Sequence, residues 1–341
     1  MSIATALTRQ LGIKHPILLA PMDVVADTRL AVAVSEAGGL GLLGGGYGSE
    51  AWLTGELDSI GRSGARFGVG FITWSLAKQP HLLDLVLGRR PAAVMLSFGD
   101  ATPFARRIHD AGALLICQIQ TVALAREAVA AGADILVAQG TEAGGHGASR
   151  GLFTLLPEVV DAVGPGIPVV GAGGIADGRG LAAALALGAA GVLVGTRFYA
   201  TQEAAAPDTA KQRVVAASGD DTQRSIVFDI TRRNVWPAPF TGRCLRNVHL
   251  DKWLGREVEL LREQEAESRK YVAAQKAENF ELAAIIAGEA SGLVRDVPPV
   301  RDVIERMMRQ AVALRRGDGA GAGPDGAAMA SPPKAERVAT E

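Results

Sequence analysis

Eight short apolar segments recur at similar intervals along the first 200 residues, with one longer interval before Pro168. Apolar and polar residues do not alternate within them, which is typical of strands buried on both faces of a parallel sheet. The predicted strands are Ile17–Ala20, Leu40–Leu43, Phe67–Ile72, Ala93–Ser97, Leu114–Gln118, Ile135–Gln139, Pro168–Ala172 and Gly191–Gly195.

Amphipathic or alanine-rich segments separate these strands and are predicted to be helices, for example Thr28–Ala37, Thr102–Ala111, Val122–Ala131 and Gly178–Leu187. Eight repeats of strand and helix indicate an α/β protein, a (β/α)8 TIM barrel, over residues 1–200. A doubly wound open sheet is the alternative, and the count of eight strands argues against it.

The pattern changes after residue 200. We predict a strand at Ser225–Thr231 and helices at Arg256–Ala277 and Phe280–Ala287, so that residues 201–298 form a mainly helical appendage over the barrel mouth. Residues 299–315 are expected to form a closing helix that completes the barrel wall. Residues 316–341 lack apolar periodicity and are rich in Gly, Ala and Pro, which predicts a disordered tail.

The charge balance excludes several kinds of partner. The chain has 35 basic and 36 acidic residues and a formal net charge of −1, so no overall field attracts nucleic acid or an anionic membrane. The longest apolar run, Leu181–Val194, is too short to span a bilayer. Cys117 and Cys244 match no metal-site spacing, and two isolated cysteines fit a reducing cytoplasm. We therefore expect a cytoplasmic protein with a small-molecule substrate and no metal.

Two glycine-rich turns predict a phosphate site. Active sites of TIM barrels lie at the C-terminal ends of the strands. There, Ala172-Gly173-Gly174 follow the seventh strand, and Gly195-Thr196 follow the eighth. Glycines let backbone N–H groups approach an anion closely, and a following helix adds partial positive charge. Barrel turns are often rich in Gly, but two such turns on adjacent strands favour phosphate binding.

His146 is the candidate catalytic residue. It lies in Glu142-Ala143-Gly144-Gly145-His146-Gly147, after the sixth strand. Its glycine neighbours offer no side chains to pack against, so we expect it to project from a flexible loop into the barrel mouth. Imidazole exchanges a proton near neutral pH, which suits acid–base chemistry. The alternative is a solvated loop histidine.

Three segments carry a resemblance to a known family: HPILLAPM, AQGTEAGGHG and GIPVVGAGGIADGRGLAAALALGAAGVLVGTRF. Together they resemble the nitronate monooxygenase (2-nitropropane dioxygenase-like) family of FMN-binding TIM barrels. The resemblance implies that FMN lies across the barrel mouth and that His146 is the catalytic histidine. The residues that it implies for FMN binding are Ala20, Pro21, Met22, Gln118, Gly145, Ala172, Gly173, Gly174, Gly195 and Thr196.

The resemblance implies an enzyme that oxidises alkyl nitronates with O2 to a carbonyl compound and nitrite. The same scaffold also resembles FMN-dependent reductases, which use NAD(P)H to reduce enoyl thioesters or quinones. A barrel similar to IMP dehydrogenase is a further alternative, but it needs a nucleophilic cysteine, and neither Cys117 nor Cys244 follows a fitting glycine-rich turn. A flavin-binding protein without catalysis and a homo-oligomeric state are both left open.

Two positions depart from the family pattern. Many relatives have Asn where this chain has Gly70, so a side-chain contact to FMN is expected to be missing there. A Gly-Gln pair that is common near the C-terminal end is Gly288-Glu289 here. Both departures bear on the substrate more than on flavin binding.

Overall fold

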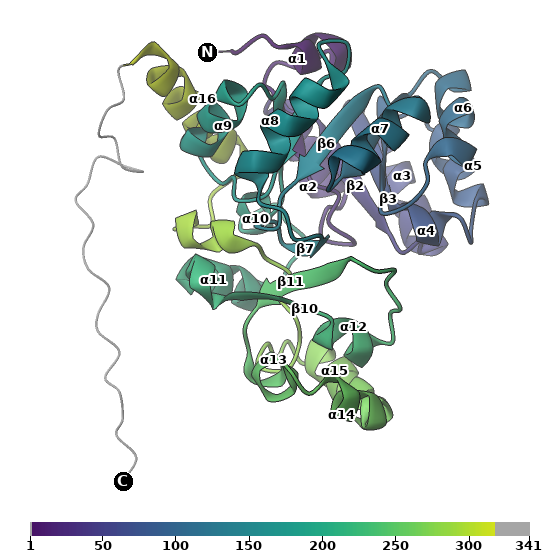
Figure 1. Cartoon of the computed structure of the whole chain (residues 1–341), viewed down its shortest axis with the longest axis vertical. Helices are drawn as coiled ribbons and strands as arrows, with labels where there is room; N and C mark the ends of the chain where they lie inside the picture. The colour runs from purple at the N-terminus through teal and green to yellow at the C-terminus, as the bar shows by residue number, and fades with distance from the viewer. Residues whose placement is uncertain (1, 318–341) are drawn as a thin grey trace.

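The computed structural model describes residues 2–317, in which eight parallel strands form one closed sheet (Figure 1). The strands are β1 (Ile17–Leu19), β2 (Gly41–Gly46), β3 (Phe67–Ile72), β4 (Ala93–Ser97), β5 (Leu114–Ile119), β6 (Ile135–Gln139), β8 (Val169–Ala172) and β9 (Gly191–Val194). Their order is β1-β9-β8-β6-β5-β4-β3-β2. A bridge from Leu18 to Leu40 joins the first and last strands of this order. The predicted TIM barrel is confirmed.

Helices between the strands cover the outside of the barrel. They are α2 (Thr28–Glu36), α3 (Glu50–Ser63), α4 (Thr73–Leu76), α5 (His81–Leu87), α6 (Thr102–Asp110), α7 (Val122–Ala130), α8 (Leu152–Val163) and α9 (Gly178–Ala186). Local chemistry sets several of their starts: the Asp27 carboxylate accepts the amide of Leu30, and the Thr121 hydroxyl accepts that of Leu124. Each of the longer helices buries one apolar face against the strands.

The barrel interior is a packed core, and it is closed at one end. Inward-facing side chains such as Leu42, Met95 and Ile116 meet Leu7 and Leu11 of α1 (Ala6–Leu11) in one apolar cluster. Helix α1 thus covers the N-terminal end of the strands. A cavity is present at the opposite end of the strands, where the functional loops of a TIM barrel lie.

A C-terminal helix, α16 (Val300–Arg316), completes the outer wall. It packs against α9 and α2 and buries Met307, Met308 and Ala311. Its backbone approaches α9 closely at Gly178, where an added β-carbon would lie 2.4 Å from the carbonyl oxygen of Met307. The predicted disordered tail lies outside the described residues, except for Arg316 and Gly317.

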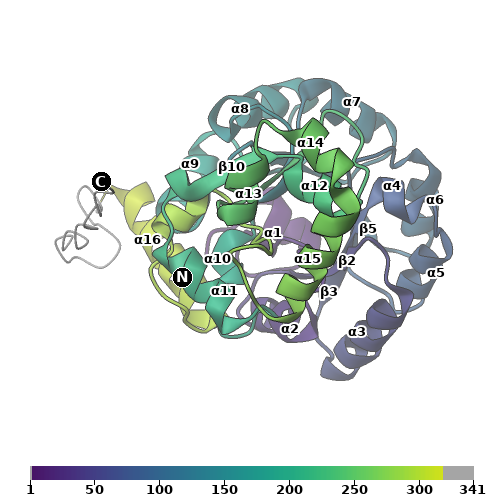
Figure 2. The ribbon, with the colours of Figure 1, turned by 90° about the horizontal axis from the view of Figure 1, so that it is seen from below.

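The segment between β9 and α16 covers the mouth of the barrel. Its elements are α10 (Thr196–Tyr199), α11 (Asp208–Ala216), the 3-10 helix η1 (Gly219–Asp221), β10 (Thr222–Ser225), α12 (Val227–Arg232), β11 (Thr241–Leu245), α13 (Val248–Trp253), α14 (Glu257–Arg262), α15 (Gln264–Lys276) and the 3-10 helix η2 (Glu289–Leu293). Figure 2 shows helices α12 to α15 lying across the barrel opening. The predicted mainly helical appendage is therefore present.

A small antiparallel sheet connects this appendage to the barrel. Strand β11 pairs with β10 on one side and with β7 (Gly145–Gly147), which lies in the loop after β6, on the other. The backbone of His146 thereby pairs with Gly242 of the appendage. The barrel and the appendage therefore share β7, the strand that carries the candidate catalytic residue.

Two predictions within the appendage were wrong. The expected strand Ser225–Thr231 is mostly helix α12, because short apolar runs suit a buried helix turn as well as a strand. Phe280–Ala287 is not helical; the carbonyl of Ile285 instead accepts the amide of Leu245 at 2.9 Å, beside the end of β11. The helical stretch expected at Arg256–Ala277 is present as α14 and α15, which a turn at Glu263 separates.

Within the part of the chain that the structure describes, no helix combines the length and the apolar character needed to cross a membrane.

Candidate active site

A cavity of about 240 Å³, partly open to solvent, lies at the C-terminal ends of the barrel strands under the appendage. The loops after five strands bring all of the predicted site residues to its wall. They are Ala20, Pro21, Met22, Gln118, Gly145, His146, Ala172, Gly173, Gly174, Gly195 and Thr196. The prediction placed these residues at one site from their positions after strands, and the structure brings every one of them together.

The Gly173-Gly174 turn forms one end of the cavity. Both residues have positive φ angles, 106° and 70°, which a residue with a β-carbon rarely adopts. Among residues 2–317, neither amide donates to a protein acceptor. Two unpaired N–H groups on a cavity wall are costly unless water or a ligand accepts them, so this turn is suited to an anion.

The first-turn amides of helix α9 already have protein acceptors, so any contribution of this helix to the anion site would come from its dipole. The amide of Gly178 donates to the side chain of Gln310, and those of Arg179 and Gly180 donate to Asp177. The first turn of α9 is therefore already capped by side chains. The hydroxyl of Thr196 lies on the other side of the turn, where it accepts the amide of Gly288 at 2.9 Å and keeps its own proton to donate.

The segment Ala20–Met22 lies against glycines of the neighbouring strands. An added β-carbon at Gly70 would lie 2.3 Å from Cγ of Pro21, and one at Gly44 would lie 2.5 Å from the carbonyl oxygen of Met22. Any side chain at position 70 would therefore collide with Pro21 in this arrangement. The missing side chain at Gly70 allows this closer approach of the first loop.

His146 does not lie on a flexible loop, contrary to the prediction. It is the central residue of β7 and is 9% exposed. Its Nε2 lies 2.9 and 3.0 Å from the two carboxylate oxygens of Asp229, and its ring stacks on Trp236 with a centroid separation of 3.4 Å. The alternative of a solvated histidine is also wrong. Burial lowers the pKa of His146, an effect that the nearby Asp229 opposes.

Sequence reasoning missed Asp229, Arg232 and Trp236. Asp229 is buried and also accepts a hydrogen bond from Arg232 at 3.1 Å. Asp229 is 83 residues from His146, and its segment was predicted to be a strand, so no pattern connected the two. The signal that could have found Trp236 is a Trp-Pro pair in the proline-containing loop 233–240.

An aromatic cluster lines the side of the cavity next to His146. Trp236 contacts Phe98 and Trp74 edge to face, and its indole N–H donates to the Tyr47 hydroxyl at 3.0 Å. Phe240 packs on Phe98. These rings come from three barrel loops and from the appendage loop 233–240. They form an apolar wall opposite the polar glycine turn.

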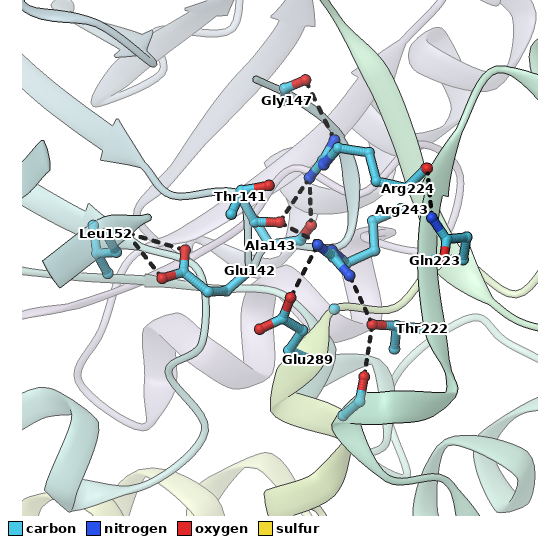
Figure 3. Close-up of polar contacts among 12 residues, drawn as sticks. Thr141, Glu142, Ala143, Gly147, Leu152, Thr222, Gln223, Arg224, Arg243 and Glu289 are labelled. Atoms are coloured by element: carbon cyan, nitrogen blue, oxygen red, sulfur yellow. Dashed lines mark hydrogen bonds and ion pairs between the residues drawn. The ribbon is translucent and has the colours of Figure 1, made fainter. Parts of the chain in front are cut away.

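Arg224 holds the loop that carries His146 (Figure 3). Its guanidinium donates to the carbonyls of Thr141 and Ala143 at 2.9 and 3.0 Å, and of Gly145 and Gly147 at 3.3 Å. It also donates to Thr241. Burial among carbonyls, with Arg243 nearby, lowers the pKa of Arg224 to about 10. One side chain on β10 therefore orders the whole loop between β6 and β7.

Glu289, the second departure from the family pattern, points away from the cavity. Its carboxylate pairs with Arg243 at 2.9 Å, while Arg243 donates to the carbonyl of Thr141 and to the Thr222 hydroxyl, as Figure 3 shows. Its backbone amide donates to the carbonyl of Glu142. Glu289 thus helps to hold the loop and does not line the site.

Comparison with known proteins identifies the family. The profile described as nitronate monooxygenase matches residues 4–69 and 72–310. The chain belongs to the nitronate monooxygenase family. This is a family of flavin-dependent oxidoreductases.

Individual relatives agree with this assignment. Nitronate monooxygenase npaC of Metarhizium robertsii is 38% identical over 331 residues, covering 88% of this chain and 92% of that protein. A 5-hydroxy-7a-methyl-1-oxo-octahydro-1H-indene-4-carboxyl-CoA dehydrogenase of Mycobacterium tuberculosis is 38% identical over 231 residues, covering 65% of this chain and 63% of that protein. The solved structure of FabK from Thermotoga maritima matches with a TM-score of 0.82 and 31% identity, covering 93% and 99% of the two chains.

The residues of this family member fit a flavin. The unpaired amides of Gly173 and Gly174 and the Thr196 hydroxyl are donors suited to its phosphate. Gly195 lies on the same wall beside Ala20 and Met22, since a β-carbon added there would lie 3.5 and 3.7 Å from them. Gln118 and Gln139 bring polar side chains to the wall of the same cavity.

Burial disfavours the reactive thiolate form of both cysteines of this family member. Cys117 and Cys244 are buried, and burial raises the pKa of each to about 12. Neither lines the cavity, which argues against the alternative with a nucleophilic cysteine. In residues 2–317, no group of three or more His, Cys, Asp and Glu side chains could hold a metal ion.

Proposed function

We propose that this chain is an FMN-dependent nitronate monooxygenase, which oxidises alkyl nitronates with O2 to a carbonyl compound and nitrite. The observation that carries the proposal is His146, a buried imidazole paired with Asp229 on the wall of a cavity that has an anion-binding turn at its far side. The match to the family and to npaC of Metarhizium robertsii supports it.

FMN is the flavin that the donor set favours. Gly173, Gly174, Gly195 and Thr196 form one anion site, and the sequence has no dinucleotide fingerprint for an adenosine half. Ala20, Pro21, Met22, Gln118, Gly145 and Ala172 would contact the rest of the group. When bound, the flavin supplies the electron-accepting chemistry.

The residues of this chain supply the acid–base chemistry. Because burial lowers its pKa, His146 is neutral near pH 7 and can act as a base. With a neutral nitroalkane it would take the proton from the carbon next to the nitro group, and the electrons of that C–H bond would move onto the nitro group to give the nitronate. The aromatic wall keeps water away from this position.

A reductase that uses NAD(P)H is the second candidate. The CoA dehydrogenase of Mycobacterium tuberculosis, whose name includes a thioester substrate, supports it. In a reductase of enoyl thioesters or quinones, His146 would orient or protonate the acceptor. The cavity is also compatible with such a role, because its mouth is partly open to solvent.

Reaction class and cofactor can be tested together on the purified holoenzyme. Heat-released cofactor should co-elute with FMN rather than FAD. With ethyl nitronate, the enzyme should consume O2 and release nitrite without NAD(P)H, whereas NADH or NADPH should leave the flavin absorbance unchanged under anaerobic conditions. Rapid bleaching by NADH or NADPH, with no nitrite from the nitronate, would assign the chain to the reductase class.

Cellular location and assembly stay predictions. The isolated, free cysteines favour the cytoplasm. A small-molecule substrate follows from the proposed reaction, and a homo-oligomeric state remains open.

A further inference from the structure

The two nitrogens of His146 have different surroundings. Nε2 faces both oxygens of Asp229 at 2.9 and 3.0 Å. An ionised carboxylate only accepts hydrogen bonds, so Nε2 carries the proton in the neutral ring. Nδ1 then has the lone pair, and it makes no hydrogen bond within residues 2–317. The nitrogen that can receive a proton is the one that Asp229 does not bind.

The plane of the ring is fixed from two directions. Trp236 stacks on the imidazole with an interplanar angle of 7°, and Gly242 lies opposite His146 in the β7–β11 pair. A β-carbon added at Gly242 would already lie 3.5 Å from Nε2. The side-chain amide of Gln139 donates to the His146 carbonyl at 3.0 Å. Stacking and backbone pairing therefore fix the plane of the imidazole ring. The contact with Asp229 then determines that Nε2 faces the carboxylate and that Nδ1 is left without a protein partner among residues 2–317.

Helix α12 holds Asp229 independently of His146. Thr231, on the same helix, bonds the ring of His249 at 2.8 Å, and Gln264 of α15 donates to the carbonyl of Ile230 at 2.8 Å. Arg232 donates to the carbonyl of Phe228 at 3.2 Å as well as to Asp229. The carboxylate is thus part of a preorganised helix.

We propose that Asp229 is the positioning residue for the candidate base: it binds Nε2–H of His146, presents Nδ1 to the substrate, and stabilises the imidazolium that forms. The proton-transfer part of this inference rests on the proposed function. Arg232 forms an ion pair with Asp229 at 3.1 Å and offsets the negative charge that Asp229 would place beside an anionic substrate.

The charges around His146 make Asp229 its main electrostatic partner. From α12 the ring faces Asp229 and Arg232, and from β10 it faces Arg224, whose donors are taken up by loop carbonyls. Other ionisable groups on the cavity wall are Asp23, Tyr47 and Glu142, and Arg243 packs beside the loop. Of these, Asp229 is the one carboxylate bonded to the ring in the described structure.

The central experiment compares wild-type holoenzyme with Asp229→Asn by NMR titration of histidine-labelled protein. The chain has five histidines, and a His146→Gln variant assigns the signal. Because the carboxylate favours the charged ring, its loss should lower the pKa of His146 by about one unit or more. Asp251→Asn is the matched control, since Asp251 is a half-exposed carboxylate of the same appendage and pairs with Arg246. It should leave the His146 titration unchanged.

Kinetics add a readout that a structural role would not change. Asp229→Asn should lower kcat/KM for a neutral nitroalkane about 10- to 100-fold. It should also move the acid limb of the pH profile to lower pH, because an imidazole with a lower pKa stays unprotonated down to a lower pH. A preformed nitronate needs no proton removed and should lose less. Asp229→Glu keeps the charge and should retain a His146 pKa near that of the wild type.

Three outcomes overturn the inference. The first is a His146 pKa that is unchanged in a folded, flavin-loaded Asp229→Asn protein. The second, which decides the question if Asp229→Asn does not fold, is a His146 pKa in Asp229→Glu that falls by about one unit or more below that of the wild type. The third is an equal loss of kcat/KM with nitroalkane and with nitronate. If the wild type oxidises no nitronate but Asp229→Asn lowers the pKa, the His146–Asp229 pair stands and the proposed function fails.

Discussion

His15 shows what burial does to an imidazole that has no carboxylate partner. It lies beside Lys14 under the turn at Gly38, its Nδ1 is buried without a partner in the described residues, and burial with Lys14 lowers its pKa to about 4. His146 is similarly buried, but Asp229 binds its Nε2. The same side chain is therefore a neutral core residue at one end of the barrel and a candidate base at the other.

We expect His15 to make the protein acid-sensitive between about pH 6.5 and 4. Its folded-state pKa lies below its unfolded value, so as pH falls through this window the unfolded chain binds a proton that the folded chain refuses. The free energy of unfolding should fall by about 3 kcal/mol at most and then level off. Urea titrations at a series of pH values should show a smaller loss for His15→Asn. Parallel pH profiles for the two proteins would contradict the assignment.

At the residue scale, sequence reasoning found the groups whose neighbours in sequence carry a signal. Gly173, Gly174 and His146 stood out because glycines surround them, and all line the cavity. Asp229 and Trp236 were not predictable in the same way. Their roles arise from the antiparallel pairing of β7 with β11, which brings distant segments together and has no local sequence signature.

At the scale of helices and strands, the elements of the barrel were predictable from the sequence, whereas several elements of the appendage were not. The eight barrel strands were predicted nearly to their ends, because strands buried on both faces need continuous apolar runs that turn residues interrupt. In the appendage, elements such as α12 and α14 have six residues each, which is too short for a helical period to repeat. Their conformation follows from the surfaces on which they pack.

The close contact of α16 with α9 leads to a prediction about the free energy of unfolding, for which a second glycine variant is the control. Gly178→Ala should lower the free energy of unfolding by about 1–3 kcal/mol, because the added carbon would lie 2.4 Å from the Met307 carbonyl oxygen and 2.6 Å from the Ala311 nitrogen. Gly55→Ala, inside α3 with nothing within 4 Å, should raise it by about 0.5–1 kcal/mol. Chemical denaturation measures both. A Gly178→Ala protein as stable as wild type would show that α16 packs less closely on α9.

For the whole molecule, the cavity is where barrel and appendage meet. Barrel loops provide Ala20–Met22, Gly173 and Thr196, while the appendage provides Arg232, Trp236 and Ile286. The barrel and its mouth were predictable from the order of strands. The way in which the appendage covers that mouth was not, because it depends on a shared sheet and on Arg224 binding the carbonyls of a loop far away in sequence.

Because both layers line one cavity, flavin binding should stabilise the molecule as a whole, and the phosphate should account for much of the effect. Apoprotein supplied with FMN at 100 times its Kd should gain about 2.7 kcal/mol in free energy of unfolding by mass action. Riboflavin has the same ring system without the phosphate, so at equal concentration it should raise the melting temperature much less. Thermal melts of apoprotein with each compound measure the difference.

Glycine variants test whether the turn after β8 causes the difference in stabilisation between FMN and riboflavin. Gly173→Val should abolish the advantage of FMN over riboflavin, because φ is 106° there and an added β-carbon would approach the Ala143 nitrogen and the Gly140 oxygen to 3.1 Å. Gly166→Ala, in the open turn before β8 with nothing within 4 Å, should keep the advantage intact. If riboflavin and FMN stabilise the wild-type apoprotein equally, then the Gly173-Gly174 amides do not bind a phosphate. The polar end of the cavity would then need another ligand.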